Sequence, residues 1–295
     1  MCIVVAKYFD DIGWVGAKQR DRNYVPDLSF EREEDGDLEI LMYKDNITGY
    51  REGLNSKGVS IISASLKVQD DEKEVKKRGT QHTGDGNRIN AALRESNIKR
   101  AVKTCIDQKL TGNTLIFNKD QCFLLEACQL PSEEGEEKGE YEFKLTEIQK
   151  DQTVARTNHG IKLPWAGYQP DGNSQEKESR KSSEARLKIA RRVVRAARTP
   201  QSIIDLFCVK YSKNPQMNAL RTETGTKKMR TTAQILLVPS EETMYVRPVA
   251  SDVNYNFHKL DDPDAKTWVE LLSNKPLWDN HDKKANGNIN LKHKA

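Results

Sequence analysis

Short runs of apolar and β-branched residues, separated by turn residues, fill the first part of the chain, from residue 2 to residue 66. Such runs are typical of strands. Asp10, Asp11 and Gly13 form a turn between the first two runs, which predicts a hairpin that brings residue 21 back towards the chain start. The strands that we expect in this part cover residues 3–8, 14–21, 39–43, 49–52 and 59–66.

Helical and strand periods alternate in the rest of the chain. Apolar residues three and four apart predict helices over 88–108, over 184–198, and from Pro200 to about residue 211. Polar stretches predict loops over 69–88, 131–139 and 164–183. Further strands are expected at 114–117, 122–127, 140–148, 153–157, 233–238 and 244–249. This order predicts an α+β layered fold, with one domain over 1–275 and a polar tail over 276–295.

Composition narrows the class of protein. An apolar share of 36% and a charged share of 31% are ordinary for a soluble domain. A net charge of +4 is too small to indicate a nucleic-acid partner. No apolar run approaches the roughly 18 residues of a membrane span, and the start lacks the features of a signal peptide. We therefore expect a cytoplasmic protein with no membrane partner.

Cysteine usage argues against metal and disulfide roles. The chain has five cysteines, an odd number, and none of them form a C-x-x-C pair. Neither a structural zinc site nor a disulfide framework is expected from this pattern. We expect no metal and no cofactor.

Cys2 is the strongest candidate for a catalytic residue. Removal of Met1 would leave a thiol and a free α-amine on one residue. An α-amine has a pKa of about 7.7–8.0 and can act as a base near neutrality without a histidine. A buried or edge-strand cysteine is the plain alternative, because many chains begin Met-Cys.

Asp21 adds to the case for Cys2, because the predicted hairpin brings it near the chain start. A carboxylate there would orient a terminal ammonium and tune its pKa. Lys18, Arg20 and Arg22 flank it and would lower the pKa of a nearby thiol. Taken alone, the segment KQRDR is equally typical of a charged strand end on the surface.

Several motifs together resemble the choloylglycine hydrolase and penicillin acylase family and the related acyl-coenzyme A:6-aminopenicillanic acid acyltransferases. They are the MC start, a G-x-x-x-x-D ending at Asp21, EGLNSKGVSII at 52–62, QCFLLEA at 121–127, ARTNHG at 155–160 and the closing segment at 231–248. The resemblance extends from residue 2 to about residue 250, and the order and spacing of the motifs carry it.

The resemblance implies a fold and a set of roles. The fold would be the four-layer αββα sandwich of N-terminal-nucleophile hydrolases. Cys2 would be the nucleophile and its amine the base, Asp21 would hold that amine, and Asn158 would donate to the oxyanion. Arg221 matches the family's distal arginine. The family's arginine before the aspartate aligns with Lys18, and Arg20 is next to it, so we also include Arg20.

The resemblance also suggests where a substrate binds. The second oxyanion donor falls near Ser65, whose hydroxyl is a weaker donor than the family's asparagine. The aromatic residues expected to line the acyl pocket are Trp14, Tyr24, Trp165 and Tyr168. His159 invites a Cys/His hypothesis, but a histidine base is unnecessary where an amine is present. The partner expected is a small-molecule amide, and homo-oligomers are left open.

Three hypotheses remain open at this point. The first is an amidase or acyltransferase that acts on linear amides through a thioester. The second is a glutaminase resembling class II glutamine amidotransferases, which also begin Met-Cys-x-Ile. The third is a basic nucleic-acid-associated protein with an inert site, based on the Arg-rich helix expected at 184–198. A core-packed helix with a solvated basic face explains that helix equally simply.

Overall fold

The computed structural model of the 295-residue chain describes residues 1–24, 26–66, 84–129, 140–221 and 229–248. The expected acidic loop at 131–139, most of the loop at 69–88 and the tail at 276–295 lie outside the described residues.

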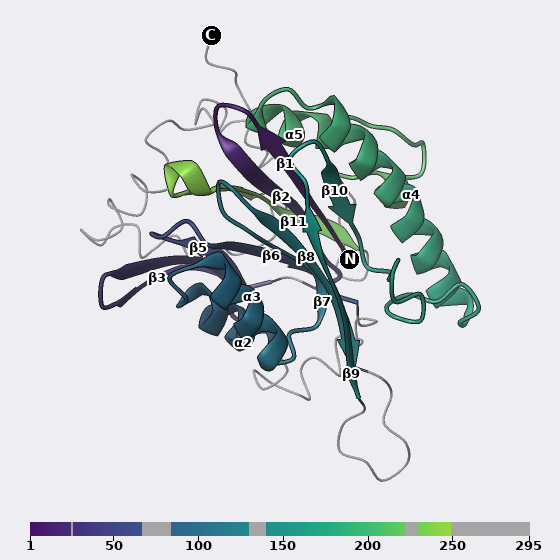
Figure 1. The fold of residues 1–295 in the computed structure, drawn as a ribbon. Helices are drawn as coiled ribbons and strands as arrows, with labels where there is room; N and C mark the ends of the chain where they lie inside the picture. Colours follow the sequence, from purple (N-terminus) through teal and green to yellow (C-terminus); the bar gives the residue numbers. More distant parts are fainter. Residues whose placement is uncertain (25, 67–83, 130–139, 222–228, 249–295) are drawn as a thin grey trace.

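Two antiparallel sheets form the body of the molecule (Figure 1). Sheet A has the strand order β10 (Thr153–Arg156), β1 (Cys2–Phe9), β2 (Gly13–Arg22), β11 (Arg230–Val238) and β12 (Thr243–Pro248). Sheet B has the order β3 (Leu28–Asp35), β4 (Leu38–Asp45), β5 (Arg51–Asn55), β6 (Ser60–Ala64), β7 (Gly112–Phe117), β8 (Cys122–Gln129) and β9 (Tyr141–Ile148).

Helices cover the outer face of each sheet. α4 (Ser174–Ala196) and α5 (Pro200–Phe207) share an apolar cluster with sheet A, and α2 (Gly84–Leu93) and α3 (Ile98–Asp107) share another with sheet B. Two 3₁₀ turns complete the described elements, η2 (Pro215–Met217) and η3 (Pro239–Glu241). A third cluster takes residues from both sheets and lies between them.

Side-chain alternation along β1 decides which residues face the other sheet. Cys2, Val4 and Ala6 belong to the cluster between the sheets, whereas Ile3 and Val5 belong to the cluster under α4 and α5. The sheets approach closely, since a Cβ atom on Gly16 of β2 would lie 2.2 Å from the Phe117 ring. The Cys2 side chain is therefore enclosed between two sheets from the first residue of β1.

The α+β class and most of the expected strands are confirmed, including the hairpin of β1 and β2, whose register pairs Cys2 with Arg20. The single helix expected over 88–108 was wrong. It is two helices, because Asn97 caps the start of α3 through its side chain. None of the described helices combines the length and apolarity needed to cross a bilayer.

Two other expectations need correction. The loop expected over 164–183 ends at residue 173, where Asn173 and Glu176 form a capping box that starts α4 ten residues earlier than its apolar pattern suggested. The strand β3 was missed because its second half is charged and lacks an apolar alternation. Its pairing with β4 across a two-residue turn stabilises the extended conformation instead.

Candidate functional site: Cys2 between the sheets

Three cations follow one another on the face of β2 that points between the sheets. Trp14 begins this face at the turn end of the strand, and Lys18, Arg20 and Arg22 end it beside Cys2. All three cations are buried. The segment KQRDR is therefore not a strand end on the surface. Its side chains alternate between the two faces of sheet A, and both faces are buried here.

Carboxylates from sheet B meet these cations. Lys18 Nζ pairs with Glu52 and also donates to the Ser63 carbonyl at 2.6 Å. Arg20 Nη2 donates to Asp45 at 2.7 Å, and its guanidinium lies 5.3 Å from the Tyr43 ring centroid. Each ion is fully buried, where an unpaired charge is costly. Three cations therefore share two carboxylates, which leaves one positive charge for the Cys2 sulfur.

Arg22 is the cation that touches the sulfur. Its Nη1 lies 3.5 Å from Cys2 Sγ, and its Nε donates to the Tyr24 hydroxyl at 3.0 Å. Burial alone raises the pKa of the Cys2 thiol, but Lys18 and Arg22 outweigh it and lower the pKa to about 6. At neutral pH Cys2 is a buried thiolate, the nucleophilic form of the side chain.

The titration of this thiol gives the first testable prediction. The difference in thiolate ultraviolet absorbance between the wild type and Cys2→Ala should rise with pH and reach half its amplitude near pH 6. Lys18→Met should move the midpoint upward, because the neutral side chain no longer favours the thiolate. Cys105 is the internal contrast, since burial raises its pKa to about 12. A Cys2 midpoint above pH 8 would show that the cations do not act on the sulfur.

Asp21 lies on the opposite face of β2, under α4. Its carboxylate accepts from Thr231 Oγ1 at 2.8 Å and pairs with Arg186 at 2.6 Å and with Arg221 at 3.4 Å. Its backbone N–H donates to the Met1 carbonyl at 3.0 Å. The hairpin thus brings Asp21 to the chain start as expected, while its carboxylate contacts two arginines. Its role in holding a Cys2 amine stays a prediction.

Met1 is enclosed with the site. It is 6% exposed, and its amine contacts the Asp21 carbonyl at 3.4 Å and Met229 Sδ at 3.2 Å. Burial lowers the pKa of this amine to about 4. The chain end is therefore covered in the folded protein, where a peptidase has no access to it.

Asn158 bridges Cys2 and sheet B. Its Oδ1 accepts the Cys2 backbone N–H, and its Nδ2 donates to the Ser65 carbonyl at 2.6 Å. Because one partner is a donor and the other an acceptor, the two bonds fix the orientation of the amide. An NH₂ group has two hydrogens, so one N–H of Asn158 remains for a group bound beside Cys2.

The backbone around Asn158 is fixed by buried polar groups. Its N–H donates to Ser183 Oγ of α4 at 3.1 Å. His159 lies against the same Ser183 hydroxyl, with Nδ1 at 2.8 Å, and burial lowers its pKa to about 4. The hydroxyl partners and the burial hold His159 as a neutral imidazole.

Glu126 organises the loop that follows Asn158. The fully buried Oε1 accepts the backbone N–H groups of Ile161, Lys162 and Leu163, each at 2.7 Å. Its other oxygen lies 3.6 Å from Arg156. The glutamate of the QCFLLEA segment thus anchors a loop that begins two residues after Asn158.

Replacing Glu126 tests this anchoring. Glu126→Ala should lower the free energy of unfolding by about 1–3 kcal/mol, because it leaves the buried Leu163 N–H and the half-buried N–H groups of Ile161 and Lys162 without their acceptor. Urea denaturation measures the effect. Glu34→Ala, which removes an exposed strand carboxylate of β3, is the matched control and should stay within about 0.5 kcal/mol. Equal stability of both variants would contradict the anchoring role.

The remaining sequence-based candidates divide into two groups. Tyr24 lies at the site, where it donates to Asp45 at 2.6 Å beside Arg22. Ser65 presents its carbonyl to Asn158, and a carbonyl cannot donate to an oxyanion. Arg20 and Arg221 contact carboxylates and are placed to position other groups.

One of the two tryptophan candidates lies far from Cys2. Trp14 pairs with Tyr8, six residues along β1 from Cys2, which is about 20 Å at about 3.3 Å per residue. It is fully buried in the core, so its inclusion in the pocket lining was wrong. Trp165 packs on Leu66, Cys128 and Leu163, and its Nε1 donates to Glu142 at 3.1 Å.

Arg186 is a site residue that sequence reasoning missed. It was counted with the basic face of the helix, but it is fully buried and pairs with Asp21. The available signal was its spacing, because Arg186 falls within the apolar stripe that continues through Leu187, Ala190 and Val194. A lone cation on such a stripe indicates a buried acidic partner.

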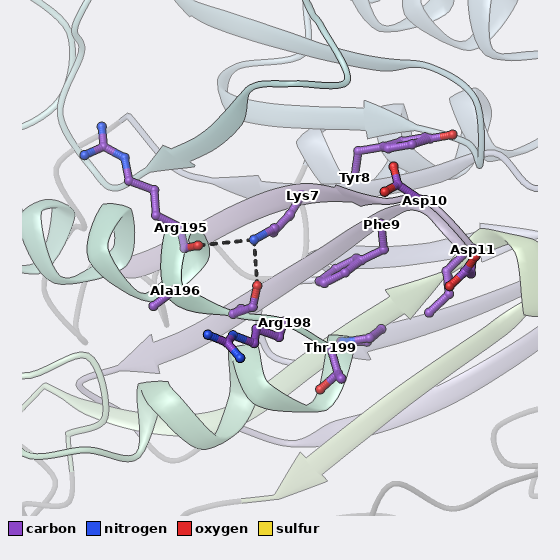
Figure 2. Close-up of a pocket in the computed structure, with 12 residues that line it drawn as sticks. Lys7, Tyr8, Phe9, Asp10, Asp11, Arg195, Ala196, Arg198 and Thr199 are labelled. Atoms are coloured by element: carbon purple, nitrogen blue, oxygen red, sulfur yellow. Dashed lines mark hydrogen bonds between the residues drawn. The ribbon is translucent and has the colours of Figure 1, made fainter.

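A surface hollow lies at the other end of β1 (Figure 2). Its volume is about 670 Å³, and it is lined by the β1–β2 turn and the junction of α4 and α5. Lys7 donates there to the carbonyls of Arg195 and Ala197 at 3.2 and 2.6 Å, which caps the end of α4. Lys7 is thus occupied structurally, and the hollow is separate from the Cys2 site.

Within the described residues, no group of three or more His, Cys, Asp or Glu side chains is arranged to hold a metal ion. No family model matches the sequence, and no curated protein matches it.

Solved structures give distant matches. The C2A mutant of conjugated bile acid hydrolase from Clostridium perfringens is similar over 84% of this chain and 89% of its own, with 10% identity and a TM-score of 0.43. Penicillin V acylase from Agrobacterium tumefaciens is similar over 85% of this chain and 87% of its own, with 8% identity and a TM-score of 0.40. Similarity at this level does not assign a function. A functional proposal therefore has to rest on the residues described above.

Proposed function

We propose that the protein hydrolyses a linear amide bond with Cys2 as an N-terminal nucleophile. The observation that carries the proposal is the environment of the sulfur. Cys2 Sγ lies 3.5 Å from Arg22 in a buried site where its pKa falls to about 6, and the backbone nitrogen of the same residue is held by Asn158. One residue thus combines an activated thiolate with a nitrogen in a fixed position.

The chemistry follows from these two groups. The thiolate attacks the amide carbon, and the carbonyl oxygen becomes an oxyanion that accepts the remaining N–H of Asn158. The C–N bond then breaks, and the leaving amine takes a proton from the α-ammonium of Cys2. Water attacks the resulting thioester, gives its proton to the α-amine, and releases the acid and the thiolate.

This scheme requires a chain that begins at Cys2. With Met1 attached, the Cys2 nitrogen is a peptide nitrogen without basicity. Because Met1 is buried in the folded protein, we propose that it is removed during synthesis, before the fold closes. The vacated space beside Asp21 and Met229 then lies next to the new amine.

The sequence motifs support the same proposal. Cys2, Asp21, Asn158 and Glu126 each come from a segment that resembles the N-terminal-nucleophile family, and the fold brings the first three to one end of the β1–β2 hairpin. The paired sheets with outer helices agree with the αββα sandwich of that family. We further propose that the protein works in a reducing compartment such as the cytoplasm, which keeps Cys2 as a thiolate.

An enzymatic screen tests the proposal. Purified protein is incubated with chromogenic acyl-amides of graded acyl length, and in parallel with glutamine while ammonia is measured. We expect release of the chromophore from at least one acyl-amide and no ammonia above the level of Cys2→Ala. Ammonia release that depends on Cys2 would favour the glutaminase hypothesis. A Cys2 thiol that stays inert to an amide or lactone probe would favour an inactive site.

A further inference from the structure

Strand β9 forms one edge of sheet B. It pairs with β8 from Cys122–Ile148 to Gln129–Tyr141, and no other described strand pairs with its opposite side. In Figure 1 it extends at the lower edge of the molecule, beyond α2 and α3. A free edge presents unpaired backbone N–H and C=O groups that can accept another strand.

This edge also exposes apolar side chains. Among the described residues, four large apolar side chains are more than a third exposed, and two of them, Phe143 at 39% and Leu145 at 41%, belong to β9. They stand opposite Ala127 and Leu125, so both lie on the helix-bearing face of sheet B. Phe143 also stacks on Tyr141, with ring centroids 5.8 Å apart, which gives the patch a fixed shape.

The charges on the other face of β9 are complementary to those of a second, antiparallel copy of the strand. Glu142 and Lys144 are partly exposed and two residues apart, on either side of Phe143. If two copies of β9 pair antiparallel with Phe143 on the two-fold axis, Glu142 of each copy faces Lys144 of the other. Tyr141 then faces Leu145. A register centred on Lys144 would instead place two like charges opposite each other.

We propose that the protein forms a symmetric dimer in which the β9 strands of two copies pair antiparallel around Phe143. The pairing joins two seven-stranded sheets into one continuous sheet across the interface. It satisfies the open backbone edge and covers Phe143 and Leu145. It also replaces the Glu142–Lys144 ion pair within each strand, 3.5 Å long, by two such pairs between the strands. A C2 interface requires such a self-complementary pattern.

A charge reversal tests the register. Analytical ultracentrifugation of the full-length protein should give the mass of a dimer for the wild type. Lys144→Glu places two carboxylates opposite each other at both ends of the pairing, so we expect at least a tenfold weaker dimer. The double variant Glu142→Lys/Lys144→Glu restores opposite charges and should recover the dimer. Lys103→Glu on exposed α3 carries the same charge change and should leave the dimer unaffected.

A cross-link provides a second test that does not depend on charge. Opposite residues of an antiparallel pair have Cα atoms about 4.5–5.5 Å apart, within the range of a disulfide. Phe143→Cys should therefore form a covalent dimer under mild oxidation, whereas Leu145→Cys, which faces position 141, should not. A monomeric wild type, a Lys144→Glu variant that dimerises normally, or equal cross-linking of both cysteine variants would overturn the proposal.

Discussion

Replacement of Cys2 by alanine is expected to abolish amide hydrolysis while the protein stays folded. The side chain lost is small, and β1 keeps its pairing with β2 and β10. Without the sulfur there is no nucleophile to form the thioester, and no other described cysteine is placed to replace it. Initial rates on the best acyl-amide and a circular dichroism spectrum from the same preparation measure both properties.

The other cysteines supply the control. Cys128→Ala removes a thiol on β8 that is buried against Leu163 and Ala166, and it should keep nearly full activity. Cys2→Ser should retain a slow reaction, since a hydroxyl is a far weaker nucleophile than a thiolate at neutral pH. Full activity in Cys2→Ala would remove Cys2 from the mechanism.

Asn158→Ala is expected to lower kcat by about 10²–10³ with a smaller effect on KM. The donor acts on a charge that develops in the transition state, so its loss affects kcat most strongly. Asn158→Asp should be at least as harmful, because it places a negative charge against the oxyanion. The Ser65 carbonyl also loses its donor, which should cost about 1–3 kcal/mol of stability.

Asn55→Ala separates the catalytic effect from this stability cost. Asn55 is also fully buried and donates to the carbonyls of Leu93 and Glu95, but it does so beside α2, on the outer side of sheet B. It should lower the melting temperature and leave kcat unchanged. If Asn158→Ala behaves like Asn55→Ala, with a lower melting temperature and unchanged kcat, Asn158 has only a structural role.

The strands could be predicted from sequence because their apolar alternation is local information. The hairpin of β1 and β2 followed from its turn residues, and it correctly brought residue 21 to the chain start. The break between α2 and α3 was hidden because their apolar residues continue the same helical spacing, and only the cap at Asn97 interrupts it.

The candidate site was less readable, because its geometry depends on partners far away in the sequence. Lys18, Arg20 and Arg22 look like surface charges until Glu52 and Asp45 of sheet B face them. Asp21 shares their segment but points to the other face, where Arg186 and Arg221 pair with it. No local pattern states which face of β2 meets which layer, so the pairing of these ions and the position of Trp14 required the fold.

The most direct test of the central claim is mass spectrometry of an acyl-enzyme trapped by acid during turnover of an acyl-amide. The account predicts a chain that lacks Met1 and carries one acyl group, and peptide mapping should place that group on Cys2. An active protein that retains Met1, or an acyl group mapped to any other residue, would contradict the account.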